Sequence, residues 1–241
     1  GIVAVILDDS RITRIHLYDT SGKELVESET TMDRSGYPLD ISISPNGELL
    51  AISYLYVDRG ILKSSIAFHN FGEVGQNLSS DRFVSGYDYR GTVIPFIHFM
   101  NSNTAFAVSD DRIMFFTGSQ KPVSAAENLL SVKVQGVFYN DEYVGLVFLN
   151  TEGDGKYRLN IYDDSGSLIT SKNFDTEYTN IIFHKDEFII CSDIEYNVYN
   201  IHGTERFSDQ FDEIVYLFVP QEKSSRFLIM TQNAMRVMEM K

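Results

Sequence analysis

Residues 36–72 read GYPLDISISPNGELLAISYLYVDRGILKSSIAFHNFG, and this stretch decides the fold. Apolar and small polar residues alternate over Asp40–Ser44, as in a strand with one buried face. Pro45-Asn46-Gly47 predicts a chain reversal, because proline sets the first corner of a turn and Asn-Gly tolerates positive φ. The apolar run within Glu48–Val57 predicts a second strand, and Lys63–Phe68 alternates again. The stretch therefore predicts an antiparallel meander, with a fourth, more polar segment following it.

The plan of this meander recurs along the chain. The third strand of each unit ends in an aromatic or apolar pair that precedes a glycine turn. These turn glycines are Gly22, Gly72, Gly118, Gly166 and Gly203. Their spacings are 50, 46, 48 and 37 residues, which is the repeat length of a four-stranded propeller blade. We therefore expect an all-β, WD40-like β-propeller of four-stranded antiparallel blades, with about six blade units in this chain.

The expected strands divide into six units, of which the first and the last are incomplete. The first unit has strands near 1–9, 11–19 and 23–31, and the second unit is residues 36–86. The later units have strands at 92–100, 103–109, 112–117 and 122–130, at 131–139, 142–150, 156–163 and 167–174, at 178–184, 186–192, 195–201 and 204–211, and at 213–219, 226–231 and 234–240. Ser124–Leu130 could instead form a helical turn, and we treat it as a strand. The even composition along residues 1–241 predicts a single propeller domain.

Composition restricts the classes of partner. The formal net charge is -14, which argues against nucleic acid and against an anionic membrane surface, because both need clustered Lys and Arg. The single cysteine, Cys191, has apolar neighbours and is expected to be buried, so a disulfide or a cysteine metal site is not expected. No apolar run approaches the roughly 18 residues of a transmembrane helix. Because the chain starts at Gly1 and enters a strand-like run at once, we expect it to be part of a longer protein.

Several segments carry a family resemblance. Gly36–Tyr54 resembles the blade opening of many WD40-like and YVTN-type propellers. Together with Lys63–Phe68, Asn70–Gly75, Val84–Tyr89 and Tyr157–Gly166, it is similar to the DUF5711 family of Gram-positive bacteria. That resemblance implies a propeller outside the membrane, tethered by an N-terminal membrane helix that this chain lacks. It implies no activity.

The sequence shows no catalytic pattern. There is no Gly-x-Ser-x-Gly elbow, and the five histidines form no metal-type pair, so we expect no catalytic residue, cofactor or metal site. The paired aspartates Asp8-Asp9, Asp110-Asp111 and Asp163-Asp164 fall at expected turns, where they would bond the turn backbone. A carbohydrate-active hydrolase or lyase with carboxylates at the central channel mouth remains the alternative.

One set of residues suggests a ligand-binding face. The connections between successive blades lie on one face of a propeller, and the expected connections carry aromatic and basic residues. The candidates are Tyr37, Arg59, Tyr87, Tyr89, Arg90 and Tyr178. These side chains could bind a sugar, a peptide or a protein, or the tyrosines could pack between blades. We therefore expect a non-enzymatic binding or scaffolding propeller.

Overall fold

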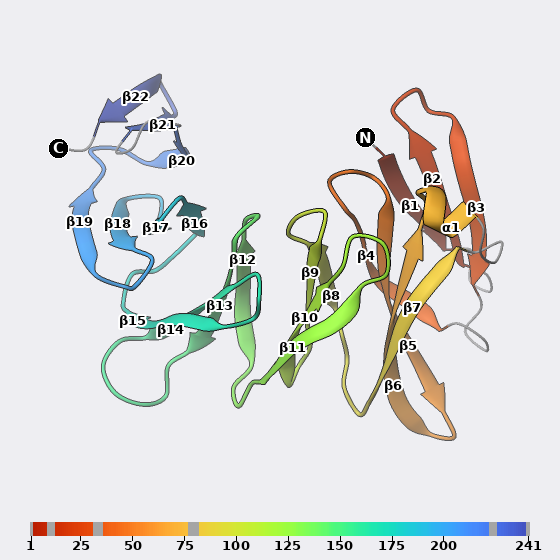
Figure 1. Ribbon diagram of the computed structural model, residues 1–241. Helices are drawn as coiled ribbons and strands as arrows, with labels where there is room; N and C mark the ends of the chain where they lie inside the picture. Colours follow the sequence, from red (N-terminus) through yellow and green to blue (C-terminus); the bar gives the residue numbers. More distant parts are fainter. Residues whose placement is uncertain (1, 9–12, 31–35, 77–81, 222–225, 240–241) are drawn as a thin grey trace. The chain divides into compact units, whose positions relative to one another are not determined.

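The computed structural model describes residues 2–8, 13–30, 36–76, 82–221 and 226–239 (Figure 1). The chain divides into two compact units. Unit 1 contains Gly1–Lys133 and Asp164–Ser167, and unit 2 contains Val134–Asp163 and Leu168–Lys241.

Unit 1 carries three antiparallel sheets, and every strand in them pairs with its neighbour in sequence. The first sheet is β1 (Ile2–Asp8), β2 (Thr13–Asp19) and β3 (Glu24–Thr30). The second is β4 (Tyr37–Ile43), β5 (Leu49–Asp58), β6 (Ile61–Asn70) and β7 (Phe83–Arg90), with the short helix α1 (Glu73–Gln76) between β6 and β7. The third is β8 (Phe96–Phe99), β9 (Thr104–Val108), β10 (Arg112–Thr117) and β11 (Val123–Leu129).

The strands of unit 2 form three further sheets of the same kind. The fourth sheet is β12 (Val134–Tyr139), β13 (Tyr143–Leu149), β14 (Tyr157–Asp163) and β15 (Leu168–Phe174). The fifth is β16 (Asn180–His184), β17 (Glu187–Cys191), β18 (Glu195–Asn200) and β19 (Glu205–Gln210). The sixth is β20 (Val215–Pro220), β21 (Arg226–Thr231) and β22 (Met235–Glu239).

The all-β prediction and its grouping into antiparallel meanders are confirmed. Residues 124–129 extend as a strand within β11 and do not form a helical turn. The prediction was wrong for the fourth strand of the second sheet, which was expected to end within the unit of residues 36–86. Helix α1 occupies the start of that segment, and β7 pairs with β6 as far as Lys63↔Arg90. The reason is that β6 is ten residues long, so its backbone can form hydrogen bonds with a longer fourth strand than we expected.

The second strand of each four-stranded sheet forms the centre of the core. All residues of β9 and of β17 are buried, because both of their faces carry apolar side chains. Phe68 on β6 shows the packing between sheets: it is fully buried and lies against Phe99 and Phe116 of the third sheet, with ring centroids 6.1 and 5.2 Å away. Burial of such large apolar side chains stabilises the fold.

Polar residues of the opening stretch also have structural roles. Asp40 on β4 accepts a hydrogen bond from the Ile97 N–H of β8 at 2.8 Å, and Ser42 accepts one from the Phe99 N–H at 3.0 Å. These bonds join the first strands of the second and third sheets. The turn that follows is closed by Ser44, whose hydroxyl accepts from the Leu49 N–H at 2.9 Å. Gly47 takes positive φ there, as expected for an Asn-Gly turn.

Candidate functional site

Tyr87 lies in the packing between two sheets. It belongs to β7 and not to a connection, so its expected position was wrong. Its hydroxyl donates to the Pro122 carbonyl at 3.1 Å and accepts from the Ser124 N–H at 3.1 Å. Its ring lies 5.1 Å from that of Phe116. These contacts fasten β7 to the start of β11.

Tyr89 and Arg90 also lie in β7, and they point to opposite faces of the sheet. Tyr89 packs on the core between the second and third sheets, with the Arg112 guanidinium 5.9 Å from its ring centroid. Burial, and then the nearby Glu127 carboxylate, raise the pKa of Tyr89 to about 12. Arg90 is exposed, and its backbone lies opposite Lys63 of β6 in the strand ladder.

Tyr37 and Arg59 lie at the same end of the second sheet. Tyr37 is the first residue of β4, and its side chain is 37% exposed. It stands in one row with Leu55, Ser64 and Tyr89 across the four strands. Arg59 is exposed at the tip of the β5–β6 hairpin. Arg59 and Gly60 both have positive φ, at 49° and 79°, as in the two-residue turns that match the twist of a hairpin.

Apolar residues at this hairpin tip were missed by the sequence analysis. Both strands of the hairpin have ten residues, and they extend beyond the row that starts at Tyr37. Val57, Ile61 and Leu62 are 66%, 51% and 36% exposed there. The length of the apolar run in β5 was the one sequence signal that could have indicated this tip. It was not used, because alternating apolar residues ordinarily predict burial.

Tyr178 belongs to unit 2, in the connection before β16. Its ring lies 5.1 Å from that of Tyr157 and 5.8 Å from those of Phe138 and Phe174, at near-perpendicular angles. Burial is the main cause of its raised pKa. The structure therefore brings Tyr37, Arg59, Tyr87, Tyr89 and Arg90 onto one sheet and places Tyr178 in an aromatic cluster elsewhere.

One of the three aspartate pairs, Asp110-Asp111, bonds to its surroundings. Asp9 of the pair Asp8-Asp9 lies outside the described residues. Asp110 accepts hydrogen bonds from the Thr92 hydroxyl and from the Val93 N–H. The Asp111 carboxylate accepts hydrogen bonds from Nε and Nη2 of Arg112, at 2.9 and 2.6 Å. These hydrogen bonds hold the pKa of Asp111 well below its usual range. Within the described residues, no group of three or more His, Cys, Asp and Glu side chains could hold a metal ion. The enzymatic alternative stays a prediction.

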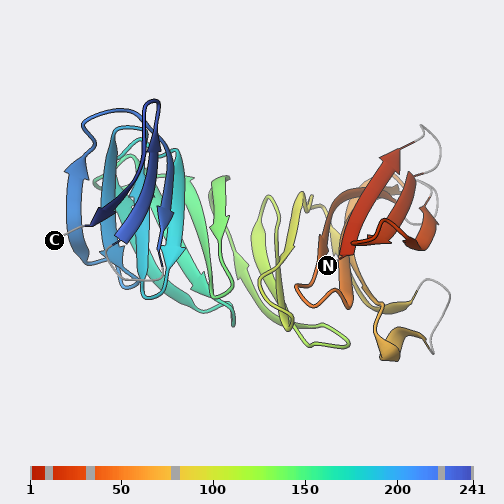
Figure 2. The same ribbon diagram turned by 90° about the horizontal axis from the view of Figure 1, so that it is seen from above.

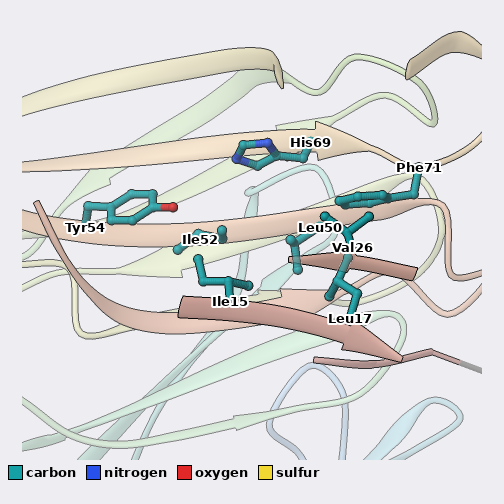
Figure 3. A pocket seen from close by; sticks show the side chains of 8 residues that line it. All are labelled: Ile15, Leu17, Val26, Leu50, Ile52, Tyr54, His69 and Phe71. Carbon is teal, nitrogen blue, oxygen red and sulfur yellow. The ribbon is translucent and has the colours of Figure 1, made fainter. Parts of the chain in front are cut away.

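A small pocket lies between the first and second sheets (Figure 3). Two of its lining residues, Tyr54 and His69, carry polar groups. The other lining residues are apolar: Ile15, Leu17, Val26, Leu50, Ile52 and Phe71. The cavity volume is about 20 Å³, which is about enough for one water molecule. We therefore interpret it as a packing gap and not as a ligand site.

Comparison with known sequences identifies the family. The family model described as "Family of unknown function (DUF5711)" matches residues 1–240. The chain belongs to the DUF5711 family. Among curated protein sequences, none matches this chain. Within its described residues, no helix is long and apolar enough to cross a membrane, and the tethered location outside the cell stays a prediction.

Similar solved structures support the propeller type of fold for this DUF5711 chain. It matches the dihydro-heme d1 dehydrogenase NirN in complex with DHE at a TM-score of 0.56 and 11% identity, over 95% of this chain and 50% of that one. It thus spans half the length of that protein. The WD40 domain of Neurospora crassa Pan2 matches at a TM-score of 0.53 and 9% identity, over 95% of this chain and 70% of that one. Identities this low show the fold alone.

Proposed function

We propose that this chain is a non-enzymatic binding module whose six sheets are blades of a WD40-like propeller. We further propose that the projecting β5–β6 hairpin is its contact surface for a protein or peptide. The observation that carries the proposal is the exposed apolar tip formed by Val57, Ile61 and Leu62. Three exposed apolar residues at one hairpin tip form an apolar patch, and apolar patches with a polar rim are typical of protein interfaces.

The hairpin is organised for binding before any partner arrives. Lys63 bonds the Asp58 carboxylate across the hairpin, and its ammonium lies 5.9 Å from the Tyr56 ring centroid. The left-handed Arg59-Gly60 turn fixes the direction of the tip. A fixed tip loses little conformational entropy on binding, which favours affinity. Arg59 and Tyr37 would then add a cation and an aromatic ring at the edge of the contact.

Peptide selection tests this proposal. A phage-displayed peptide library is panned on the protein, and the affinities of the selected peptides are compared between the wild type and the double variant Val57→Ser/Ile61→Ser. We expect a loss of at least about tenfold, as for two contact residues in a small interface. The matched control is Val123→Ser/Leu129→Ser on β11, which removes equally exposed apolar residues from another strand.

Both double variants should keep the melting temperature of the wild type, because all four side chains are exposed. Selected peptides that bind the hairpin variant as tightly as the wild type would contradict the proposed contact surface. Binding that is lost equally in the control would contradict it as well.

A further inference from the structure

Two exposed arginines lie beside the apolar tip of the β5–β6 hairpin, in a chain whose formal net charge is -14. The hairpin extends beyond the ends of β4 and β7 in the second sheet (Figure 1). Arg59 lies in the turn at the tip, and Arg90 is the last residue of β7. The residue after it, Gly91, donates its N–H to the Leu62 carbonyl at 2.9 Å. Both arginines therefore lie at the margin of the apolar patch.

The tip lies beyond the cores that hold the second sheet. Tyr54 of β5 packs with the first sheet, which lies beside the second sheet in Figure 2 (red beside orange). Tyr87 and Tyr89 of β7 pack with the third sheet on the other face. Val57, three residues after Tyr54, is already 66% exposed. A partner can therefore contact the tip without displacing either core.

Arg59 and Arg90 differ from the other arginines of unit 1 that the structure describes. Arg14, Arg82 and Arg112 each bond a carboxylate or a carbonyl oxygen of the protein. Within the described part of the chain, Arg59 and Arg90 have no such partner. Their guanidinium N–H groups are donors that solvent or a ligand must satisfy.

The charges around the tip leave it slightly positive. Residues 55–63 and 88–90 contain the cations Arg59, Lys63 and Arg90 and the carboxylates Asp58 and Asp88, a net charge of +1. Lys63 and Asp58 neutralise each other in an ion pair. The surface therefore has the opposite sign to the chain as a whole.

Carboxylates of the third sheet lie beyond the end of β7, but they have other partners. Thr92, two residues after Arg90, donates its hydroxyl to both Asp110 and Asp111. Asp111 also accepts hydrogen bonds from Arg112. These carboxylates are thus bound within their own sheet and its connection, and they leave Arg90 to the solvent.

We propose that the partner of this surface is an acidic protein segment, in which carboxylates flank a few apolar residues. This partner class depends on the function proposed above, since the same hairpin tip would bind it. Apolar side chains of the segment pack on the apolar patch, and its carboxylates pair with Arg59 and Arg90. A guanidinium suits this task, because it can bind a carboxylate through two parallel hydrogen bonds. A basic segment would bring like charges together.

Three labelled peptides test the proposal by fluorescence anisotropy. Each has three central leucines, flanked on both sides by two glutamates, two glutamines or two lysines. We expect the glutamate peptide to bind about fivefold more tightly than the glutamine peptide, as for two exposed ion pairs, and the lysine peptide to bind most weakly. Raising the salt concentration from about 0.05 M to about 0.5 M should remove the preference for glutamate, because salt screens exposed charges.

Arginine variants locate the preference on the protein. Arg59→Gln/Arg90→Gln should bind the glutamate peptide about fivefold more weakly and should no longer distinguish it from the glutamine peptide. The matched control is Lys121→Gln/Lys133→Gln, which removes two exposed cations from the connections on either side of β11. All four side chains are exposed, so both variants should keep the wild-type melting temperature.

Several results would overturn the proposal. These are a glutamate peptide that does not bind, equal affinities for the glutamate and glutamine peptides, and an equal loss of affinity in the control variant. If library-selected peptides still lose affinity for Val57→Ser/Ile61→Ser in any of these cases, the contact surface stands and only the acidic partner is refuted.

Other occupants of the tip have their own readouts. Sedimentation of phosphatidylserine vesicles with the protein would identify a lipid surface. Self-association that is lost in Val57→Ser/Ile61→Ser would identify a second copy of the chain. We expect neither, and either result would overturn the acidic segment as the occupant.

Discussion

At the scale of single residues, polar side chains in this chain mainly fasten one backbone segment to another. Asp40 illustrates this, because it belongs to the segment that resembles a propeller blade opening and it accepts the Ile97 N–H of the next sheet. Asp111 does the same for the turn before β10, where it accepts from Ser109, Thr92 and Arg112. A buried or half-buried donor left without its acceptor costs about 1–3 kcal/mol.

Asp111 gives a prediction for acid stability. Its hydrogen bonds from Arg112, Ser109 and Thr92 lower the pKa in the folded state, so folding favours the carboxylate. The stabilisation is fully present above the ordinary carboxyl pKa of 3.8 and is lost as the pH falls below that value. Asp111→Asn should cost about 1 kcal/mol near neutral pH, a modest amount because the side chain is 43% exposed. It should also reduce the fall in the free energy of unfolding as the pH is lowered below 3.8.

Urea unfolding of Asp111→Asn at a series of pH values from neutral to acid checks this prediction. Asp154→Asn, in the exposed β13–β14 hairpin, is the control and should follow the wild type. An acid limb as steep in Asp111→Asn as in the wild type would contradict the role given to Asp111.

At the scale of the elements, the alternation of apolar residues and the glycine turns predicted most strands. These signals are local, so they could be found without the structure. The ends of β7 could not, because they depend on the length of β6, with which β7 pairs. For the same reason Tyr87, Tyr89 and Arg90 were expected in a connection. The exposed hairpin tip was also missed, since Val57 and Ile61 have the sequence pattern of buried residues and only the structure shows that they are 66% and 51% exposed.

Tyr87 allows a test of how the outer strands are joined. Tyr87→Phe keeps the ring contacts with Phe68 and Phe116 but removes the hydroxyl that bonds Pro122 and Ser124. We expect a loss of about 1–2 kcal/mol in the free energy of unfolding. Tyr216→Phe, on a tyrosine that is largely exposed, should change it little. Denaturation of both variants measures the difference, and equal stability of Tyr87→Phe and the wild type would show that Tyr87 serves another purpose.

At the scale of the whole molecule, six antiparallel sheets repeat one plan. The second strand is the most buried, and the third and fourth strands are joined through a bulge in all four of the four-stranded sheets in the described residues. The plan explains why the turn glycines recur at blade-like spacing, and it explains the match to propeller structures at about 10% identity. The sequence pattern predicted the repeat, whereas contacts between sheets such as that of Tyr87 with Pro122 and Ser124 required the structure.

Residue-resolved amide hydrogen exchange in the native state tests this repeated plan most directly. Exchange reports the free energy of local opening, which rises with burial and with hydrogen bonding on both edges of a strand. We predict the slowest exchange in the second strands β5, β9, β13 and β17 and faster exchange in the outer strands β7, β11, β15 and β19. Second strands that exchange as fast as the outer strands would contradict the plan.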